Sequence, residues 1–476
     1  MRRLPFFPST RLLLVAGITA YAAGFAALSA LRHDAFITGR FDLGNMVQAV
    51  WSTAHGHPLE MTDLHGDQIS RLAAHVDPIL VVFAPLWWIW PSPDLLLVAQ
   101  AIAVAVGALP VYWLARKHLG SAHSALGFAL AYLLYPATGW LTLNEFHPVA
   151  LATPLLLFAF WYLDEDRLLP FTALAIAAAA CKEEIALVVA GFGIWYALSH
   201  KRWLAGAAIA GVAGLWAAVA IAVVIPHYNA GAESDFYGRY SEVGGSAAGI
   251  VKTAFTHPGR IAHAAFSGRD LRYLAQLVLP LAGLSLLAPL VLIAALPELA
   301  INLLSATPTQ TSIHFHYTAG LIPPLVIAAI LGARRLPRWT IPVAMVAVAA
   351  ALVGNYRLGP LPGWRHVPGG STFQSTAARV SEHDRIAARA LRLIPANAVV
   401  SATNTLGAHL SARRRVLSFP YLQDATWIAA DETQPGYGDR YAPLPTALAL
   451  AALRRDADWR LVFERDGVLV FNRAPA

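Results

Sequence analysis

The chain has 476 residues, of which 57% are hydrophobic and 13% charged, with a mean hydropathy of +0.52. Soluble domains carry roughly 25% charged residues, so this composition excludes an ordinary soluble protein and predicts a multi-pass membrane protein. The net charge of +7 does not indicate a nucleic-acid partner, because in a membrane protein the placement of basic residues matters more than their sum. The single cysteine, Cys181, excludes an internal disulfide and a multi-cysteine zinc site.

The first apolar segment, 11–31, is followed by a polar stretch. At about 20 residues the segment is long for the apolar region of a signal peptide, so we interpret it as an uncleaved membrane anchor. The stretch 32–78 is rich in His and Asp and predicts an exposed loop that is available for binding or catalysis. The segment 79–90 is rich in tryptophan and short for a crossing, which is typical of an interfacial or re-entrant helix.

Further apolar segments bring the predicted number of transmembrane helices to about eleven. They are 94–116, 121–139, 148–163, 169–182, 185–199, 203–225, 273–287, 289–305, 319–333 and 338–354. Pro280, Pro289 and Pro297 should bend or break the pair at 273–305. Lys and Arg cluster before the first span and after the second, sixth and tenth, which is one side if the spans number eleven. The positive-inside rule makes that side the cytoplasm, so we expect a cytoplasmic N-terminus and an extracytoplasmic C-terminus.

The composition changes to that of a soluble sequence near Pro360. We therefore divide the chain into a polytopic membrane domain, 1–358, and a soluble extracytoplasmic α/β domain, 359–476, of ordinary domain size. The segment predicts helices at 377–393 and 446–454, strands at 398–402 and 416–419, and a hairpin at 459–471 that turns at Asp466-Gly467.

Polar clusters interrupt the apolar segments and mark a candidate site, because ionisable groups in or beside a membrane are costly and commonly functional. The clusters are Asn144–Pro148, Lys182–Glu184, Glu298 with Asn302, and Gln310 with His314, His316 and Tyr317. With eleven spans, most of these clusters lie with the first loop at or near the outer face, and Glu298 lies somewhat deeper. Structural alternatives remain open for three of these clusters. Asn144–Pro148 could form a helix cap, Lys182–Glu184 could form an ion pair between helices, and His314 and His316 could be ordinary polar loop residues.

Asp42 is the first choice for a catalytic residue. It lies in Gly39–Gly44, with apolar neighbours on both sides. A carboxylate in such surroundings is expected to be partly desolvated, which raises its basicity. The alternative is that Asp42 caps a helix that begins at Leu43.

Several motifs together resemble the DUF2079 family of multi-span membrane proteins, which is grouped with the GT-C glycosyltransferases. They are Phe41-Asp42-Leu43-Gly44 with Gln48 and Trp51, His75 with Pro78, Gly107–Tyr112, Tyr135-Pro136, Glu145–Pro148, Lys182-Glu183, Leu296–Glu298 with Asn302, and His316-Tyr317. The resemblance covers nearly the whole chain and implies a mainly α, GT-C-like helix bundle with a small C-terminal α/β domain. It also implies sugar transfer from a polyprenyl-phosphate-type donor, with a catalytic acid in the first outer loop. Asp42 matches that position, although Leu43 stands where such enzymes often carry a second acid.

Transfer from a phosphate-linked sugar needs a base, positive charge for the departing phosphate and a site that excludes water. We assign Asp42 as the general base. The residues assigned to the phosphate or sugar are Arg40, His75, Glu145, His147, Lys182, Glu183, Glu298, His316 and Tyr317. The His and Asp content of the first loop permits a divalent cation, without a recognisable ligand spacing.

The expected partners are the lipid bilayer, a lipid-linked sugar donor and an acceptor whose identity the sequence leaves open. Two other functions also stay open at this point. One is a membrane transporter, which would show inverted repeats and charges near the midplane. The other is a non-catalytic protein of envelope assembly, since a fold alone does not determine a function.

Overall fold

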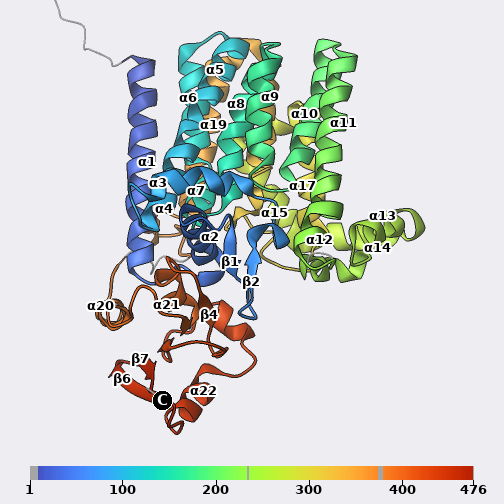
Figure 1. The fold of residues 1–476 in the computed structure, drawn as a ribbon. Helices are drawn as coiled ribbons and strands as arrows, with labels where there is room; N and C mark the ends of the chain where they lie inside the picture. The colour runs from blue at the N-terminus through green and yellow to red at the C-terminus, as the bar shows by residue number, and fades with distance from the viewer. Residues whose placement is uncertain (1–8, 233–234, 374–378, 475–476) are drawn as a thin grey trace, which may run out of the picture.

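The computed structural model describes residues 9–232, 235–373 and 379–474. It consists of a helix bundle and a smaller domain of helices and strands that lies against one end of the bundle (Figure 1). Helix α1 (Thr10–Asp34) runs the height of the bundle and ends near the C-terminal domain (Figure 1). Arg2 and Arg3, which contributed to the predicted orientation, lie outside the described residues, as do the first two residues of the helix predicted at 377–393.

The apolar runs of the sequence form the bundle, because a helix satisfies its own backbone hydrogen bonds in an apolar environment. The helices between α1 and the C-terminal domain are α2 (Asn45–Ala54), α3 (Ala84–Trp87), α4 (Asp94–Val106), α5 (Ala108–Leu119), α6 (Ala122–Leu134), α7 (Pro136–Leu143), α8 (Pro148–Asp164), α9 (Leu168–Ala179), α10 (Ile185–His200), α11 (Trp203–Val219), α12 (Ile225–Tyr228), α13 (Ala247–Thr256), α14 (Pro258–Ala265), α15 (Gly268–Val278), α16 (Pro289–Leu292), α17 (Leu296–Leu303), α18 (Ile322–Ala333) and α19 (Thr340–Leu358). Of these, α13 and α14 extend to one side of the bundle (Figure 1). A short hairpin of β1 (Glu60–Thr62) and β2 (Gln68–Ser70) lies in the loop after α2.

Fewer helices than predicted have the length of a membrane crossing. Among the described residues four helical stretches are long and apolar enough, namely Thr10–Asp34, Asp94–Leu119, Trp203–Tyr228 and Pro337–Leu358. The pair α6 and α7, bent by 48° at Tyr135, brings the number to five, and the remaining apolar helices have 10–17 residues. The structure therefore supports a mainly helical membrane protein and does not confirm the predicted count of eleven spans.

The predicted spans at 273–287 and 289–305 are not two straight helices. Helix α15 ends before Pro280, and the backbone then turns through left-handed conformations at Ala282 (φ 55°) and Gly283 (φ 70°). The second segment is divided into α16, a 3-10 turn at Ile293–Ala295 and α17. The break at 280–283 follows from the missing proline N–H and the left-handed residues, neither of which a continuing α-helix accommodates.

Basic residues gather at the end of the bundle that faces away from the C-terminal domain. The turns after α5, α8 and α10 lie at this end, together with the start of α1 (Figure 1). The turn after α18 joins them, because Arg334 contacts His118 at the end of α5. The one-sided clustering expected from the sequence is therefore present, and the assignment of this side to the cytoplasm stays a prediction.

The C-terminal domain is a five-stranded sheet between two layers of helices. The strand order is β4 (Val416–Ser418), β3 (Val400–Ala402), β5 (Trp427–Asp431), β7 (Val468–Arg473) and β6 (Trp459–Arg465). Strands β4, β3 and β5 are parallel, and β7 pairs antiparallel with both β5 and β6. Helices α20 (Glu382–Leu391) and α21 (Asn404–His409) pack on one face and α22 (Thr446–Leu453) on the other. Alternate residues of β7 point to opposite faces, so Val470 joins the first core and Phe471 the second.

The hairpin around Asp466-Gly467, the strands at 400–402 and 416–418 and the helices at 382–391 and 446–453 confirm the sequence predictions to within a few residues. Strand β5 and helix α21 were not predicted. Both are short, with five and six residues, and their burial comes from long-range packing instead of a local pattern.

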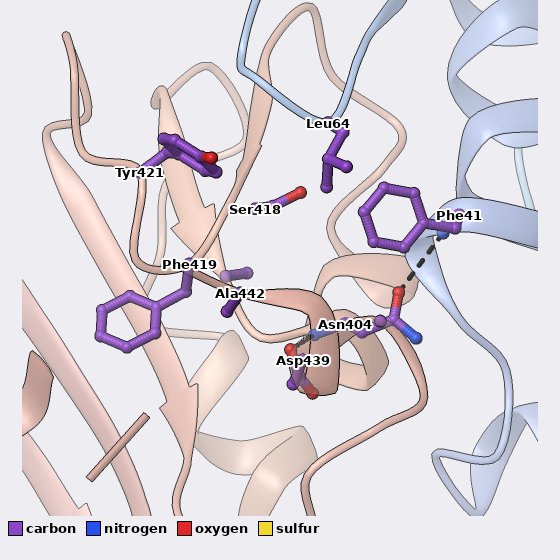
Figure 2. Close-up of a pocket in the computed structure, with 10 residues that line it drawn as sticks. Phe41, Leu64, Asn404, Ser418, Phe419, Tyr421, Asp439 and Ala442 are labelled. Carbon is purple, nitrogen blue, oxygen red and sulfur yellow. Dashed lines mark hydrogen bonds between the residues drawn. The ribbon is translucent and has the colours of Figure 1, made fainter. Parts of the chain in front are cut away.

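A π-helix at Arg40–Gly44 joins the bundle to the C-terminal domain. The Arg40 guanidinium donates hydrogen bonds to the carbonyl oxygens of Thr62 (3.1 Å), Asp63 (3.1 Å) and Val416 (3.2 Å), and to Ser418. Next to it, the side chain of Phe41 lies over a small pocket at the ends of β3 and β4, and its N–H points to Asn404 Oδ1 (Figure 2). The domain thus fixes the turn that carries the next residue, Asp42.

Candidate functional site

Asp42 lies at the surface of the π-helix, with 50% of its side chain exposed. Glu145 holds this turn from the opposite side, because its Oε2 atom accepts hydrogen bonds from the N–H groups of Gly39 and Leu43, both at 3.0 Å. Glu145 comes from the break between α7 and α8 and has a left-handed backbone (φ 50°). No cap hydrogen bond forms from a side chain at the start of the π-helix or of α2, so the alternative reading of Asp42 as a helix cap is wrong.

His147 contacts Asp42 directly. Its Nε2 atom is 3.3 Å from Asp42 Oδ1, and its Nδ1 atom is 2.8 Å from the carbonyl oxygen of Asn144. The carbonyl oxygen of Asn144 can only accept a hydrogen bond, and so can the carboxylate of Asp42 when it is ionised. The two hydrogen bonds together therefore need a proton on each ring nitrogen of His147. The geometry therefore fits an imidazolium–carboxylate pair.

His316 completes this part of the site from a distant segment. Its ring stacks on that of His147 with centroids 3.8 Å apart and planes 21° apart, and its N–H donates to Asn144 Oδ1 (3.2 Å). Helix α8 begins at Pro148, and its N-cap residue His147 makes no side-chain cap hydrogen bond, so the segment 144–148 leads into the helix with Pro148 in the first turn and contributes its polar side chains to the site.

Two cations flank the ring of Tyr317. Lys182 Nζ lies 5.9 Å from the ring centroid, and Arg239 donates a hydrogen bond to the hydroxyl oxygen (3.2 Å). Asn302 in α17 holds the backbone by donating to the carbonyl oxygen of Tyr317 (2.8 Å). Lys182 also forms an ion pair with Glu184, but both residues lie in the turn between α9 and α10, so this pair does not tie two helices together as the structural alternative expected.

His75 and Glu183 link the first loop to the same region. Glu183 contacts His75 Nδ1 at 2.9 Å and accepts a hydrogen bond from the N–H of Val76 (2.9 Å). The His75 ring stacks on Phe236, with centroids 4.7 Å apart, and the Arg239 guanidinium lies 4.5 Å from the centroid of the same Phe236 ring. Since Arg239 also binds Tyr317, these contacts connect the first loop, the turn before α10 and the turn before α18.

Most of the residues assigned from the sequence thus belong to one contact network. Its members are Asp42, His75, Glu145, His147, Lys182, Glu183, His316 and Tyr317. Glu298 lies in α17, is 3% exposed and has an Oε2 atom with no hydrogen-bond partner among the described residues. Among the described residues no hydrogen bond or ion pair joins it to the network, so it lies beside Lys182 without contacting it through a polar atom.

Arg40 does not face the network. It is 1% exposed and its donors bind the backbone and Ser418 at the domain junction, as described above. The assignment of Arg40 to phosphate is therefore not supported by its geometry, and its role is structural. Arg239 is instead the arginine at the site, and it was not predicted from the sequence. The available signal was an arginine flanked by aromatic residues within the polar stretch 226–272.

The charge on Asp42 is set by its neighbours. The surrounding protein partly desolvates the Asp42 carboxylate, which by itself would raise its pKa. The hydrogen bond and charge of His147, and then the charges of Arg71 and Arg239, outweigh this effect and hold the pKa of Asp42 below its ordinary value of 3.8. The expected increase in basicity by desolvation was therefore wrong. Burial first, and then the charge of Asp42, raise the pKa of the adjacent Glu145. The pKa values of the two carboxyl groups are therefore shifted in opposite directions, which is typical of functional pairs.

Lys182 and His316 also have shifted pKa values, one raised and the other lowered. Burial lowers the pKa of Lys182, but Glu184, Glu183 and Glu298 outweigh it and raise the net pKa above the ordinary value of 10.5, so the ammonium stays charged. Burial and then the charges of His147 and Lys182 hold the pKa of His316 well below 6.5, which makes its imidazole neutral.

A metal site does not emerge from the part of the chain that the structure describes. No three His, Cys, Asp or Glu side chains are grouped there in a way that could hold a metal ion. In the first loop, His57 instead contacts Glu60 (3.3 Å) and His65 contacts Asp63 (3.8 Å). The site therefore consists of an ionised carboxylate beside paired imidazoles, with two cations on a tyrosine ring.

Two solved structures share this architecture over nearly the whole chain. ArnT from Cupriavidus metallidurans bound to undecaprenyl phosphate has a TM-score of 0.53 and 13% identity, with 97% of each chain covered. The same protein in the apo state has a TM-score of 0.56 and 14% identity, with 97% of this chain and 98% of that chain covered. The chain therefore shares the fold of ArnT.

Residues 32–470 match the family described as "Predicted membrane protein (DUF2079)". The chain belongs to the DUF2079 family, which confirms the resemblance seen in its motifs. Comparison with curated proteins yields no significant match.

Proposed function

We propose that this protein is a membrane glycosyltransferase that moves a sugar from a polyprenyl-phosphate-type donor to an acceptor on the extracytoplasmic face. The observation that carries the proposal is the position of Asp42, a half-exposed carboxylate at the edge of a buried network of imidazoles and cations. The GT-C fold adds support, since one structure with this fold is ArnT bound to undecaprenyl phosphate.

Asp42 acts as the general base in this proposal. Its ionised carboxylate takes the proton of the acceptor hydroxyl as that oxygen attacks the anomeric carbon of the sugar. The bond between that carbon and the phosphate oxygen breaks, and its electrons leave with the phosphate, so the sugar configuration is inverted. Glu145 is a positioning residue, because it holds the turn on which Asp42 lies.

Lys182 and Arg239 stabilise the departing phosphate. Both cations lie against Tyr317, one over the ring and one at the hydroxyl, so positive charge is gathered around this side chain. An arginine can bind a phosphate with two parallel hydrogen bonds, and a lysine acts as a point charge. His75 stacks on Phe236, which Arg239 also contacts, and the ring of His316 packs against that of Tyr317, so both imidazoles lie next to these cations.

The direct test offers radiolabelled polyprenyl-phosphate sugar and a membrane glycolipid extract to the purified protein. We expect the label to move to an acceptor with the wild type, and the rate to fall by about 100-fold or more with Asp42→Asn, as for loss of a general base. Asp67→Asn is the matched control, since Asp67 is exposed in the same loop and its hydrogen bonds, both with Asp63, use its backbone and not its carboxylate.

Donor binding is measured separately by competition with undecaprenyl phosphate. Arg239→Gln should weaken competition by about tenfold or more, the loss expected for one charge-assisted hydrogen bond. Transfer that is equal in the wild type and Asp42→Asn would exclude Asp42 as the base. No transfer and no binding of undecaprenyl phosphate by the wild type would instead favour a transporter or an assembly protein.

A further inference from the structure

A second hollow lies at the end of the bundle that faces away from Asp42 and the C-terminal domain. It has a volume of about 770 Å³ and is bordered by the last residues of α5, α8 and α10 and by the turn after α18. In Figure 1 these helix ends lie at the top, and the C-terminal domain lies at the bottom. Ligand cavities typically measure about 300–1,000 Å³, so the hollow can hold a molecule larger than an ion.

Positive charge dominates the rim. The lining contains Lys117, Arg334 and Arg335 but one carboxylate, Asp164. Lys117 Nζ forms an ion pair with Asp164 (2.7 Å) and a second one with Glu165 (2.6 Å). The two arginines therefore have no acidic partner within the described ranges.

A relay of hydrogen bonds holds Arg334 at the rim. His118 Nε2 donates to Asp164 Oδ2 at 2.9 Å, which leaves His118 Nδ1 as an acceptor. Arg334 Nη1 donates to that nitrogen at 3.4 Å. Arg335 makes no side-chain hydrogen bond or ion pair among the described residues, so its guanidinium has all five donors available.

The deeper wall is apolar. Trp195 and Val291 are buried there, and Leu331 is half-buried. Cations at helix C-termini stabilise the helix dipole, which accounts for the presence of basic residues but not for a hollow with an apolar wall. A basic rim above an apolar wall is complementary to an amphiphile with an anionic head.

We propose that this cavity binds the phosphate group of an anionic membrane phospholipid from the leaflet on this face. Arg334 and Arg335 bind the phosphate oxygens, because guanidinium groups match phosphate in geometry and are weakly hydrated. The apolar wall receives the upper part of the acyl chains. The inference does not depend on the proposed transferase activity, since it uses no residue of the Asp42 network.

Native mass spectrometry of the full-length protein in neutral detergent tests the proposal. The probes are dioleoyl phosphatidylglycerol, dioleoyl phosphatidylcholine and inorganic phosphate. We expect phosphatidylglycerol to bind at least tenfold more tightly than phosphatidylcholine. Arg334→Gln combined with Arg335→Gln should remove this preference, since each lost charge-assisted contact weakens binding by about tenfold. Arg338→Gln is the matched control, because Arg338 is exposed in the same turn and does not line the cavity.

Equal binding of the two lipids by the wild type would overturn the proposal, as would an unchanged preference in the double variant. Displacement of phosphatidylglycerol by inorganic phosphate at equal concentration would overturn the lipid source and identify a site for a free anion. Thermal unfolding without added lipid shows whether the double variant is folded. If it is not, Arg334→Lys with Arg335→Lys retains the charge but removes the paired donors, and it should keep only part of the preference.

Discussion

The Nε2 atom of His147 lies 3.3 Å from the Oδ1 atom of Asp42, although the two residues are 105 positions apart in the chain. The hydrogen bond and charge of His147 are, after burial, the largest influences on the pKa of Asp42, and both lower it. The proposed base is therefore ionised throughout the neutral range, and His147 is the main reason.

Replacing His147 with alanine should move the acid side of the pH–rate profile to higher pH. The pKa of Asp42 rises when the hydrogen bond is lost, because burial is then less opposed. Wild-type transfer should stay level from pH 8 to about pH 5, and the variant should lose activity at a higher pH than the wild type. The measurement is initial transfer rate from pH 4 to pH 8. An acid limb at the same pH in both proteins would show that His147 does not set the ionisation of the base.

Replacing Glu145 with alanine should destabilise the turn that carries Asp42. The N–H groups of Gly39 and Leu43 both lose their acceptor, at a cost of about 1–3 kcal/mol for each buried donor left unpaired. Glu145→Gln keeps one acceptor oxygen and should recover much of the stability. Thermal unfolding and transfer activity are compared for both variants. Equal melting temperatures for Glu145→Ala and the wild type would contradict a positioning role.

Replacing Arg40 with methionine should loosen the C-terminal domain and leave the affinity for undecaprenyl phosphate unchanged. The substitution removes the donor for three carbonyl oxygens and Ser418, which predicts a loss of several kcal/mol, at about 1–3 kcal/mol for each buried acceptor left unpaired. Limited proteolysis should release the C-terminal domain faster than in the wild type. Arg392→Gln, an exposed change in the same domain, is the control. Weaker lipid binding without faster cleavage would restore the phosphate role expected from the sequence.

The C-terminal domain should lose local stability at alkaline pH. The His383 ring contacts Asp431 at 2.8 Å and Asp466 at 2.9 Å. Burial lowers the pKa of His383, but these hydrogen bonds outweigh it and raise the pKa above 6.5. The stabilisation is complete below pH 6.5 and is lost as the pH rises through the raised value. Hydrogen exchange in α20 and the β6–β7 turn should be faster at pH 8.5 than at pH 6, after correction for intrinsic rates. His383→Gln should remove this difference, and a difference that persists would refute the role of His383.

Local signals in the sequence determined the membrane class, the polar loop, the β6–β7 hairpin and the motifs that place the chain in its family. Such signals suffice because the length of an apolar run and the chemistry of a turn are properties of neighbouring residues. The same signals selected Asp42, His147, Lys182 and His316 from segments that the structure brings together.

Only the tertiary structure decided which arginine lies at the site and how Asp42 ionises. Arg40 and Arg239 are both basic residues in polar stretches, and packing buries one at the domain junction while it places the other on Tyr317. The pKa of Asp42 depends on His147, Arg71 and Arg239, which reach it from three segments of the chain. The tertiary structure also decided the helix lengths, because it bends the pair α6 and α7 at Tyr135 and leaves several apolar segments as helices of 10–17 residues. Contacts between distant segments, and the electrostatic fields that they create, leave no local pattern in the sequence and arise only when the chain folds.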